Sequence, residues 1–302
     1  MTGPYYDEQN YAAFLGLLAE HTRRETSWAW VLPVPLDLTM GTQAGTCLGP
    51  PAILAASTQV SWYDSEVGVE AAPLYGVHTL PTLYPRLESP EMAVADVTAE
   101  VEQLAVEDHL LVTLGGEHTL TAGVVLAFKP RYPDLVVVQI DARPDLHDLW
   151  HGTAYSFATV GRRIAEQAPL FQFGIRSLES DEIAFIQQSD RVAVYTADTM
   201  RRDRSHLYLD ALEAEIHGRP VYLTIDVSGL DPAIVPNGRP SEPGGVGWHD
   251  ALDLIRRTAS AAQPIVALDC VGLCADRGSS GSAYAAATLI YRTLNLIWKR
   301  RG

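Results

Sequence analysis

The chain has 302 residues, of which 47% are hydrophobic, so it can bury a substantial core as one large α/β domain or as two smaller domains. Its 22 basic and 37 acidic side chains give a formal net charge of −15. That charge is a poor match for nucleic acid or an anionic membrane surface, and it suits a small neutral or cationic substrate.

The N-terminal residues and the cysteines predict a cytoplasmic protein. The opening residues lack the basic-then-apolar pattern of a signal peptide, and no apolar run reaches the roughly 18 residues of a membrane span. Cys47, Cys270 and Cys274 form no CxxC pair, and so small a number fits free thiols in a reducing compartment.

The first third of the chain is predicted to hold short elements separated by irregular connections. An amphipathic helix is expected over 11–22 and a short apolar strand over 28–34. After a loop rich in Gly and Thr, a helix can begin near Pro50, because the missing N–H of a proline has no partner at a helix start anyway. The Pro-rich stretch 65–95 is expected to form surface connections, and 97–105 to be helical.

From residue 109 onward the predicted strands and helices alternate regularly. This alternation indicates right-handed βαβ crossovers and a mainly parallel sheet covered by helices on both faces. No linker-like stretch interrupts it, so we expect a single three-layer α/β/α domain over 1–302. The predicted strands are 109–114, 135–140, 170–175, 192–196, 221–225 and 265–268, and the predicted helices are 119–128, 181–188, 207–216, 249–261 and 283–298.

Polar side chains gather where three of these strands end. His118 follows the first of them, Asp141 and Asp145 follow the second, and Asp226 follows the strand that ends at residue 225. Ligands of open α/β sheets bind at the carboxyl ends of strands, where these four side chains can meet. One imidazole and three carboxylates suit Mn²⁺ or a similar divalent ion, with Zn²⁺ as an alternative.

The same pattern has a structural explanation. A single Asp after a strand is more often a helix cap or turn former than a ligand, although four polar residues at three strand ends are harder to explain in this way. Two carboxylates as close as Asp141 and Asp145 need a cation, which a metal ion, the guanidinium of Arg143, or both can supply. The residues alone leave these alternatives open.

An ordered set of motifs resembles the ureohydrolase family of arginases and agmatinases over nearly the full length of the chain. The most specific are GGEH, which is similar to the family's GGDH, and DARPD, which is similar to DAHxD. The set comprises GTCLGPPAI at 45–53, GGEH at 115–118, DARPD at 141–145, HGT at 151–153, GIR at 174–176, LTIDVSGLDP at 223–232 and SEPGG at 241–245.

The resemblance implies a three-layer α/β/α fold, trimeric or hexameric assembly, and hydrolysis of guanidino groups at a dinuclear manganese centre. It assigns the first manganese to the residues His118, Asp141, Asp145 and Asp226, all of which are present. It also assigns the proton-shuttle position to His151, whose alternative role is that of a capping or surface histidine.

Three positions depart from the family pattern. Arg143 and Ser228 stand where the family has a histidine and an aspartate that bind the second manganese. A guanidinium cannot ligate a cation and a serine hydroxyl replaces a carboxylate poorly, so the second ion is expected to be absent. Gly272 stands where the family has the glutamate that receives the substrate guanidinium, unless Glu117 or Glu242 takes its place.

The two substitutions, Arg143 and Ser228, can compensate each other in charge. One divalent ion, three carboxylates and Arg143 sum to zero, as −3 +1 +2, which is also the sum for two ions with four carboxylates and neutral imidazoles. We therefore expect the Arg143 guanidinium to occupy the place of the second ion and to hydrogen-bond to Asp141 or Asp226. The alternative is an Arg143 that Pro144 turns toward solvent.

Two functions follow from these observations. The first is a divergent, metal-dependent C–N hydrolase of a guanidino, amidino or related small molecule, with one Mn²⁺ per chain, or Zn²⁺ or another divalent ion, and with His151 and Asp141 as catalytic residues. Ordinary arginase or agmatinase activity is then expected to be weak. The second is a catalytically inactive relative without a metal, retained as a binding or regulatory protein or as a subunit of an oligomer.

Overall fold

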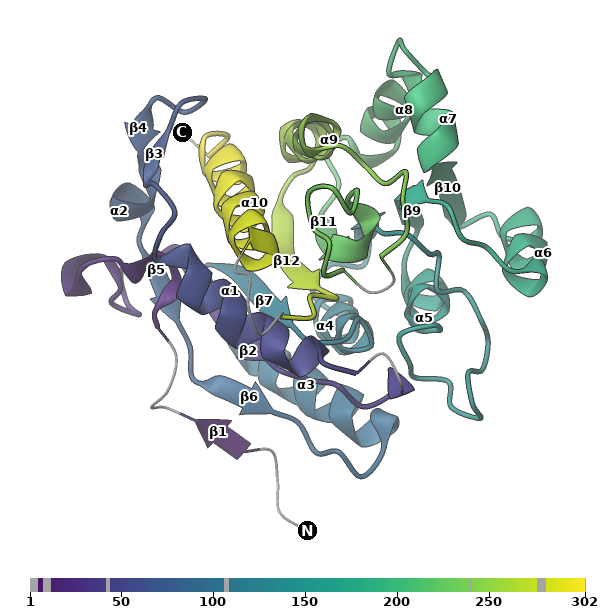
Figure 1. The fold of residues 1–302 in the computed structure, drawn as a ribbon, viewed down its shortest axis with the longest axis horizontal. Helices are drawn as coiled ribbons and strands as arrows, with labels where there is room; N and C mark the ends of the chain where they lie inside the picture. The colour runs from purple at the N-terminus through teal and green to yellow at the C-terminus, as the bar shows by residue number, and fades with distance from the viewer. Residues whose placement is uncertain are drawn as a thin grey trace.

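In the computed structural model, eight parallel strands form one central sheet (Figure 1). The structure describes residues 5–7, 12–41, 44–105, 109–238, 241–275 and 281–301. From one edge to the other, the strands are β10 (Val192–Thr196), β9 (Leu170–Ile175), β8 (Val136–Ile140), β11 (Val221–Asp226), β12 (Ile265–Val271), β7 (Leu110–Gly115), β2 (Ala29–Val34) and β5 (Val77–Thr79).

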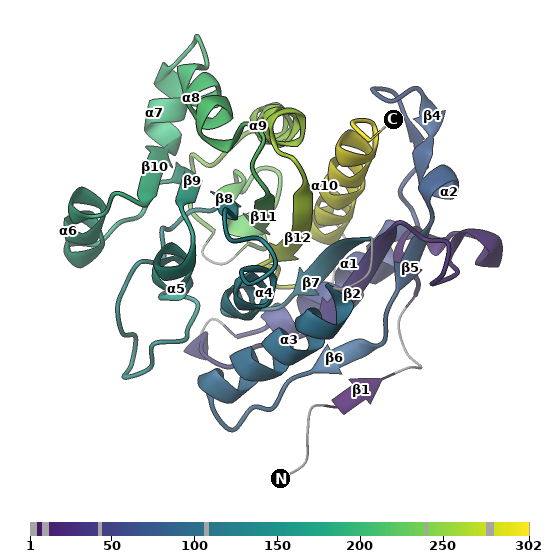
Figure 2. The same cartoon turned by 180° about the vertical axis from the view of Figure 1, so that it is seen from behind.

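Helices cover both faces of this sheet, as the two opposite views show (Figures 1 and 2). One face packs against α1 (Gly49–Ser57), α8 (Leu207–Ile216), α9 (Trp248–Ala261) and α10 (Gly281–Trp298). The other face packs against α3 (Pro90–Leu104), α4 (Leu120–Phe128) and α5 (Val160–Gln167). The predicted three-layer α/β/α architecture with a mainly parallel sheet is therefore confirmed.

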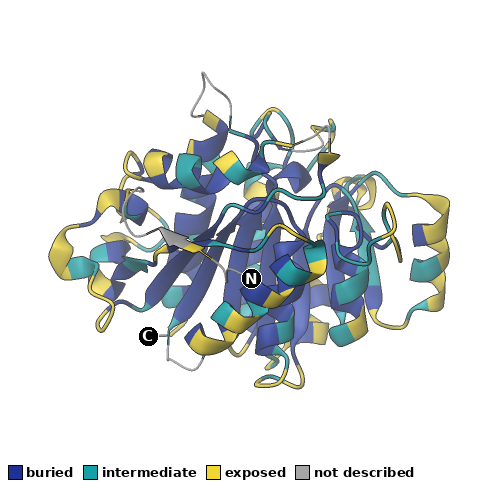
Figure 3. Cartoon of the chain, turned by 90° about the horizontal axis from the view of Figure 1, so that it is seen from below, coloured by how far each residue is buried: buried dark blue, intermediate teal, exposed yellow. Residues whose placement is uncertain are grey.

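The alternation of side chains along each strand produces two hydrophobic cores. Val136, Val138 and Ile140 of β8 belong to the core on one face, whereas Val137 and the preceding Leu135 belong to the core on the other. Successive side chains of a strand point to opposite faces, so a strand covered on both sides must be apolar throughout. The strands are accordingly buried, and the exposed residues lie mainly on the helices and loops around them (Figure 3).

The predicted helix over 11–22 is wrong for the part of it that the structure describes. Two short 3₁₀ turns, Phe14–Gly16 and Ala19–His21, replace it. Leu15 and Gly16 both adopt left-handed backbone conformations, with φ of 65° and 59°, which an α-helix cannot contain. Phe14 and Leu15 are nevertheless buried, whereas Leu18 is 60% exposed.

The stretch 65–95, predicted to be irregular, contains several short elements. These include the small helix α2 (Ala71–Tyr75), the edge strand β5, and β6 (Thr82–Tyr84), which pairs with β1 (Tyr5–Asp7). The helix expected over 97–105 begins earlier, as α3, because Pro90 occupies its first turn and Ser89 Oγ accepts a hydrogen bond from the Met92 backbone N–H.

Three helices were not predicted, namely α2, α5 and α7 (Ala197–Arg202). The remaining elements are α6 (Ser180–Gln188), the β3 (Tyr63–Asp64) and β4 (Val69–Glu70) hairpin, and the short 3₁₀ turns Thr46–Leu48 and Val227–Gly229. None of the described helices is long and apolar enough to cross a membrane.

Candidate metal centre

The carboxyl ends of β7, β8 and β11 bring the four predicted ligands together. His118 Nδ1 lies 3.0 Å from Asp141 Oδ2, 3.5 Å from Asp145 Oδ2 and 3.7 Å from Asp226 Oδ2. All four side chains are buried. The prediction that these strand ends meet at one point is therefore met by the structure.

The two glycines before His118 allow the chain to turn sharply beneath the loop that follows β2. A Cβ placed on Gly116 would lie 1.9 Å from the carbonyl oxygen of Leu36, so no other residue fits at this position. The neighbouring Glu117 accepts hydrogen bonds at both oxygens, from the backbone N–H groups of Leu38 and Thr39 and from the hydroxyls of Thr39 and Thr119. Glu117 thus fixes the loop, and both of its oxygens are already occupied by donors of the protein.

Hydrogen bonding fixes the tautomer of His118. Thr224 Oγ1 donates to Asp269 Oδ1 over 2.6 Å, so at 2.9 Å it can only accept from His118 Nε2. In a neutral ring Nδ1 then carries the lone pair. Although Nδ1 is only 3.0 Å from Asp141, it has no partner in hydrogen-bonding geometry among the described residues.

A lone pair directed at three carboxylates requires a cation or a proton between them. Beside these groups lies a cavity of about 20 Å³, lined by His118, Asp141, Asp145 and Asp226 among others. This volume is room for one water-sized species and too little for an organic substrate. One imidazole nitrogen and three carboxylates around such a cavity fit a divalent metal ion.

Asp269 completes the support of His118, and the sequence analysis did not identify it as a site residue. It lies fully buried within β12 and accepts hydrogen bonds from Thr121 (2.6 Å), Tyr222 (2.5 Å) and Thr224 (2.6 Å). Burial raises the pKa of Asp269, while the hydroxyl donors favour its ionised form. A carboxylate that orients a ligand histidine through an intervening group is a common second layer of metal sites. The available signal was an aspartate in the middle of an apolar strand.

Four donors hold the Asp141 carboxylate. Oδ1 accepts from the backbone N–H groups of Ala142 (2.6 Å) and Arg143 (3.2 Å) and from the hydroxyl of Ser228 (3.1 Å), and Oδ2 accepts from Gln139 Nε2 (2.9 Å). Burial disfavours the ionised form, but the interaction with His118 and these donors hold the pKa of Asp141 below its ordinary value.

The ionised forms of the other two carboxylates are less stable than that of Asp141. Burial, followed by the charge of Asp141, raises the pKa of Asp145 to about 7. The same two causes raise the pKa of Asp226 well above its ordinary value. Burial alone would lower the pKa of His118, but the neighbouring Asp141 and Asp145 raise it well above its ordinary value. Protons thus neutralise this cluster when no cation does.

Arg143 does not make the contacts predicted for it. Its guanidinium lines the cavity, but its charged partner is Glu242, with Nη2 3.4 Å from Oε1. Among the described residues it makes no hydrogen bond or ion pair with the carboxylate of Asp141 or Asp226, and only its backbone N–H reaches Asp141. Pro144 and the turn that follows β8 place the guanidinium at the rim, where its side chain is 34% exposed.

The two other substituted positions are also close to the ligands. Ser228 closes the space beside Asp141 through its hydroxyl and donates its backbone N–H to Asp226 Oδ1 over 2.7 Å. Gly272 has a positive φ of 79°, and a Cβ at this position would lie 2.3 Å from Asp226 Oδ1. Gly272 therefore supplies no carboxylate, and its backbone packs against the ligand itself.

Glu242 lies at the rim of the site. Its carboxylate accepts from Ser177 Oγ over 3.0 Å, and its carbonyl oxygen accepts from Arg176 Nη2 over 2.8 Å. Arg176 also donates to the carbonyl oxygen of Ser228 over 2.7 Å, so it ties this segment to the end of β11. The GIR motif thus has a structural role that the sequence analysis did not specify.

His151 does not line the cavity in the structure. It is exposed on the loop that follows β8, with a left-handed φ of 49°, and its ring centroid lies 5.0 Å from that of Trp150. A different histidine, His147, lines a second cavity of about 80 Å³ that shares Arg143 and Asp145 with the first. Its Nδ1 lies 2.7 Å from Asp181 Oδ2. The sequence analysis did not identify His147.

Comparison with known proteins agrees with this geometry. The sequence model of the arginase family matches residues 28–295. The chain is 32% identical over 270 residues to the N(1)-aminopropylagmatine ureohydrolase of Synechocystis sp., with 87% of each chain covered. It is 26% identical over 286 residues to the agmatinase of Bacillus cereus, with 93% of this chain and 95% of that protein covered.

The fold is also that of solved structures whose sequences are more distant. Proclavaminate amidino hydrolase from Streptomyces clavuligerus superposes with a TM-score of 0.86 at 22% identity, covering 96% of this chain and 98% of that one. The agmatine ureohydrolase of Thermoplasma volcanium gives a TM-score of 0.84 at 23% identity, with 97% of both chains covered. From the match of the family model and the similarity to these ureohydrolases over most of its length, the chain belongs to the arginase family.

Proposed function

We propose that the protein is a divergent, metal-dependent hydrolase of a guanidino C–N bond, with one divalent ion per chain and Mn²⁺ as the preferred ion. The observation that carries this proposal is the lone pair of His118 Nδ1, which faces three carboxylate oxygens beside an ion-sized cavity. His118, Asp141, Asp145 and Asp226 would hold the ion. The bound ion would polarise the substrate and lower the pKa of an attacking water.

The surroundings of Asp141 support a single ion. The oxygen that faces away from His118, Oδ1, already accepts from Ser228 and from two backbone N–H groups. These donors occupy the positions from which a second ion would approach, and neither Ser228 nor Arg143 offers an anionic ligand. Zn²⁺ or another divalent ion remains an alternative occupant of the one site.

The second cavity supports a substrate with a cationic end. Its described lining includes the carboxylates of Asp145, Glu179 and Glu182, together with the aromatic ring of Trp150. Carboxylates and an aromatic face are the groups that bind ammonium and guanidinium ions. The substrate named for the Synechocystis relative, N(1)-aminopropylagmatine, fits this chemistry, and we propose a guanidino compound of this type for the present chain.

Two groups can exchange protons at the rim of the site. His151 holds the family's proton-shuttle position but lies exposed, whereas His147 lines the second cavity and is polarised by Asp181. We propose that one of them protonates the leaving amine. Glu242 is the carboxylate that we propose for contact with the substrate guanidinium, since Gly272 cannot supply one.

A second function has its own support. Position 272 lacks a carboxylate, and Arg143 and Ser228 provide no ligands for a second ion. Turnover of arginine or agmatine should therefore be weak, because each lost transition-state contact costs about 10²-fold or more. An inactive relative that serves as a binding or regulatory protein or as a subunit is the alternative. In either case we propose a cytoplasmic homo-oligomer, trimeric or hexameric, that acts on small molecules.

Metal content and urea release together test the proposal. The protein would be purified without added metal, loaded with Mn²⁺, analysed by mass spectrometry of the metal, and assayed with N(1)-aminopropylagmatine, agmatine and arginine. One ion per chain and urea release from at least one substrate, lost in His118→Asn, support the hydrolase. One bound ion without urea release supports the binding protein, and failure to bind any divalent ion would refute the metal centre.

A further inference from the structure

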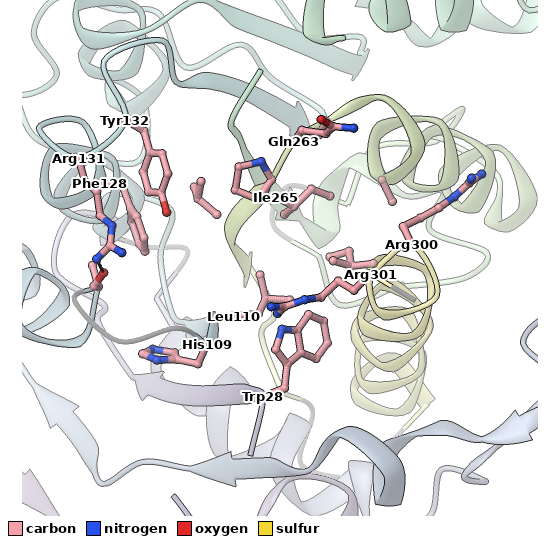
Figure 4. A pocket seen from close by; sticks show the side chains of 16 residues that line it. Trp28, His109, Leu110, Phe128, Arg131, Tyr132, Gln263, Ile265, Arg300 and Arg301 are labelled. Carbon is pink, nitrogen blue, oxygen red and sulfur yellow. Dashed lines mark hydrogen bonds between the residues drawn. The ribbon is translucent and has the colours of Figure 1, made fainter. Parts of the chain in front are cut away.

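A third cavity, larger than the two at the metal centre, lies at the opposite end of the strands, where β2, β7 and β12 begin. Its volume is about 530 Å³, which is within the range of small-molecule sites. Trp28 and Leu110 form its floor, Phe128 and Tyr132 one wall, and Ile265 the wall across from them (Figure 4). The strands run parallel, so this cavity is separated from the metal centre by the length of the sheet.

The charge of this cavity is opposite to that of the protein. The chain carries −15, yet the described lining residues include three arginines, Arg131, Arg300 and Arg301, and no Asp or Glu. In Figure 4 the guanidinium of Arg131 lies beside Phe128 and that of Arg301 lies over Trp28, whereas that of Arg300 points away from the other lining side chains. Cations gathered in a cleft with apolar walls concentrate the positive potential there.

Arg131 and Arg300 each keep most of their N–H donors unused by the described residues. Arg131 Nη1 donates to the carbonyl oxygen of Ala105, and Arg300 Nη2 donates to Ser260 Oγ over 2.6 Å. Both acceptors are neutral, and a guanidinium has five N–H donors. Neither side chain forms an ion pair within the described part of the chain. An anion entering the cavity beside Arg131 would therefore gain charge-assisted hydrogen bonds without displacing a carboxylate.

The aromatic residues add a second kind of contact. Phe128 and Tyr132 lie with ring centroids 6.3 Å apart at an interplanar angle of 29°. Trp28 carries the Arg301 guanidinium over its ring, with Cζ 5.3 Å from the centroid. The indole N–H of Trp28 is buried and has no acceptor in the described structure. A buried donor without a partner is uncommon and marks a place for an acceptor atom.

We propose that this cavity binds an organic anion with a flat ring, a phosphate or carboxylate of about the size of a mononucleotide. The anionic group would lie between Arg131 and Arg301 and accept from Trp28 Nε1, and the ring would contact Phe128 and Tyr132. This site is separate from the metal centre, and the proposal does not depend on the hydrolysis proposed above.

Isothermal titration of the metal-loaded protein with AMP and with indole-3-acetate tests the site. Binding of either is expected, and the two arms distinguish a phosphate from a carboxylate ligand. Adenosine and inorganic phosphate, which each retain one half of AMP, should bind at least tenfold more weakly than AMP if AMP is the ligand. Arg131→Gln and Arg301→Gln should each weaken binding about tenfold, since each removes a charge-assisted hydrogen bond.

Controls separate the cavity from general electrostatics. Trp28→Phe keeps a ring but removes the N–H, and it should also weaken binding. Arg202→Gln changes an exposed arginine of α7 by the same charge and should leave affinity unchanged. The proposal fails if neither probe binds, or if Arg202→Gln reduces affinity as much as Arg131→Gln. It also fails if the cavity variants keep their native melting temperature and bind like the wild type.

Discussion

The hydroxyl of Ser228 donates a hydrogen bond to Oδ1 of Asp141 over 3.1 Å. The side chain beside this oxygen of Asp141 is therefore a neutral donor. An anionic side chain at the same position would provide a ligand for a second cation. Ser228 therefore stabilises the Asp141 carboxylate without adding charge.

Replacing this donor with an acid should create a second ion site. We expect Arg143→His combined with Ser228→Asp to raise the bound Mn²⁺ from one towards two ions per chain, because two carboxylates and an imidazole would then face the same space. Metal analysis after dialysis measures the change. The Arg143→His, Ser228→Ala protein is the control and should remain at one ion. Equal stoichiometry in the two variants would contradict the prediction.

Loss of the Arg143 guanidinium should have little effect on stability. Its partner Glu242 is 3.4 Å away, and the two side chains are 34% and 26% exposed. Ion pairs of this exposure contribute about 0–1 kcal/mol, whereas breaking a buried pair with Asp141 would cost about 3–5 kcal/mol. Urea denaturation of Arg143→Gln should show a change below about 1 kcal/mol. A loss of 3 kcal/mol or more would place the guanidinium inside the cluster.

The metal-free protein should lose stability as the pH rises from about 4 to 7. Asp145 has a pKa of about 7 in the folded protein, against about 3.9 in an unfolded chain, so the folded state binds more protons in this window. The raised pKa of His118 acts in the same direction. Ionising Asp145 costs up to about 4 kcal/mol.

Thermal melting in a metal chelator across this pH range measures the effect. Asp145→Asn should flatten the pH dependence, because its amide has no proton to lose. Added Mn²⁺ should restore the melting temperature of the wild type most strongly near and above pH 7, where the carboxylate is ionised. Parallel pH profiles of melting temperature for the wild type and Asp145→Asn would show that Asp145 does not cause the pH dependence.

The link through Thr224 should be important for metal affinity. Thr224→Val removes the acceptor that keeps the proton on His118 Nε2, so it should weaken Mn²⁺ binding about 10–100-fold. Thr113→Val is a matched control in β7, two strands away from Thr224 in the same sheet, because the Thr113 hydroxyl is buried without a hydrogen-bond partner in the described structure. Competition with a fluorescent chelator measures both affinities, and equal affinities would show that the link does not orient the histidine.

We predict that residues 1–302 unfold as one domain. Every strand of the main sheet contributes to a core, and both cores share the same strands, so neither can be lost alone. Circular dichroism and tryptophan fluorescence should give coincident denaturation curves. Two separate transitions in the monodisperse, metal-free protein would indicate two domains.

The sequence predicted the features that depend on local pattern. Apolar runs such as Val136–Ile140 identify buried strands, and parallel strands bring their carboxyl ends to one edge, so the meeting of His118 with Asp141 was predictable. Charge balance suggested that Arg143 points inward, but the direction of a long side chain depends on the turn at Pro144 and on Glu242, which is 99 residues away along the chain.

Long-range pairing also explains the other omissions. Asp269 and His147 have roles only through partners far away in sequence, such as Thr121 for Asp269 and Asp181 for His147. Nothing in the local sequence of either residue specifies these contacts. The short helix α7, in contrast, had a local signal that was missed: Thr196 accepts a hydrogen bond from the Thr199 backbone N–H at its N-terminus.

The backbone of Gly272 leaves no room for a side chain at this position. A side chain at this position would begin 2.3 Å from an oxygen of Asp226, at a φ of 79° that disfavours every residue except glycine. A glutamate arriving first would displace a metal ligand and add a second negative charge beside it. A carboxylate could therefore be introduced at position 272 only if the strand end moved first, so a single substitution cannot place one there without disturbing Asp226.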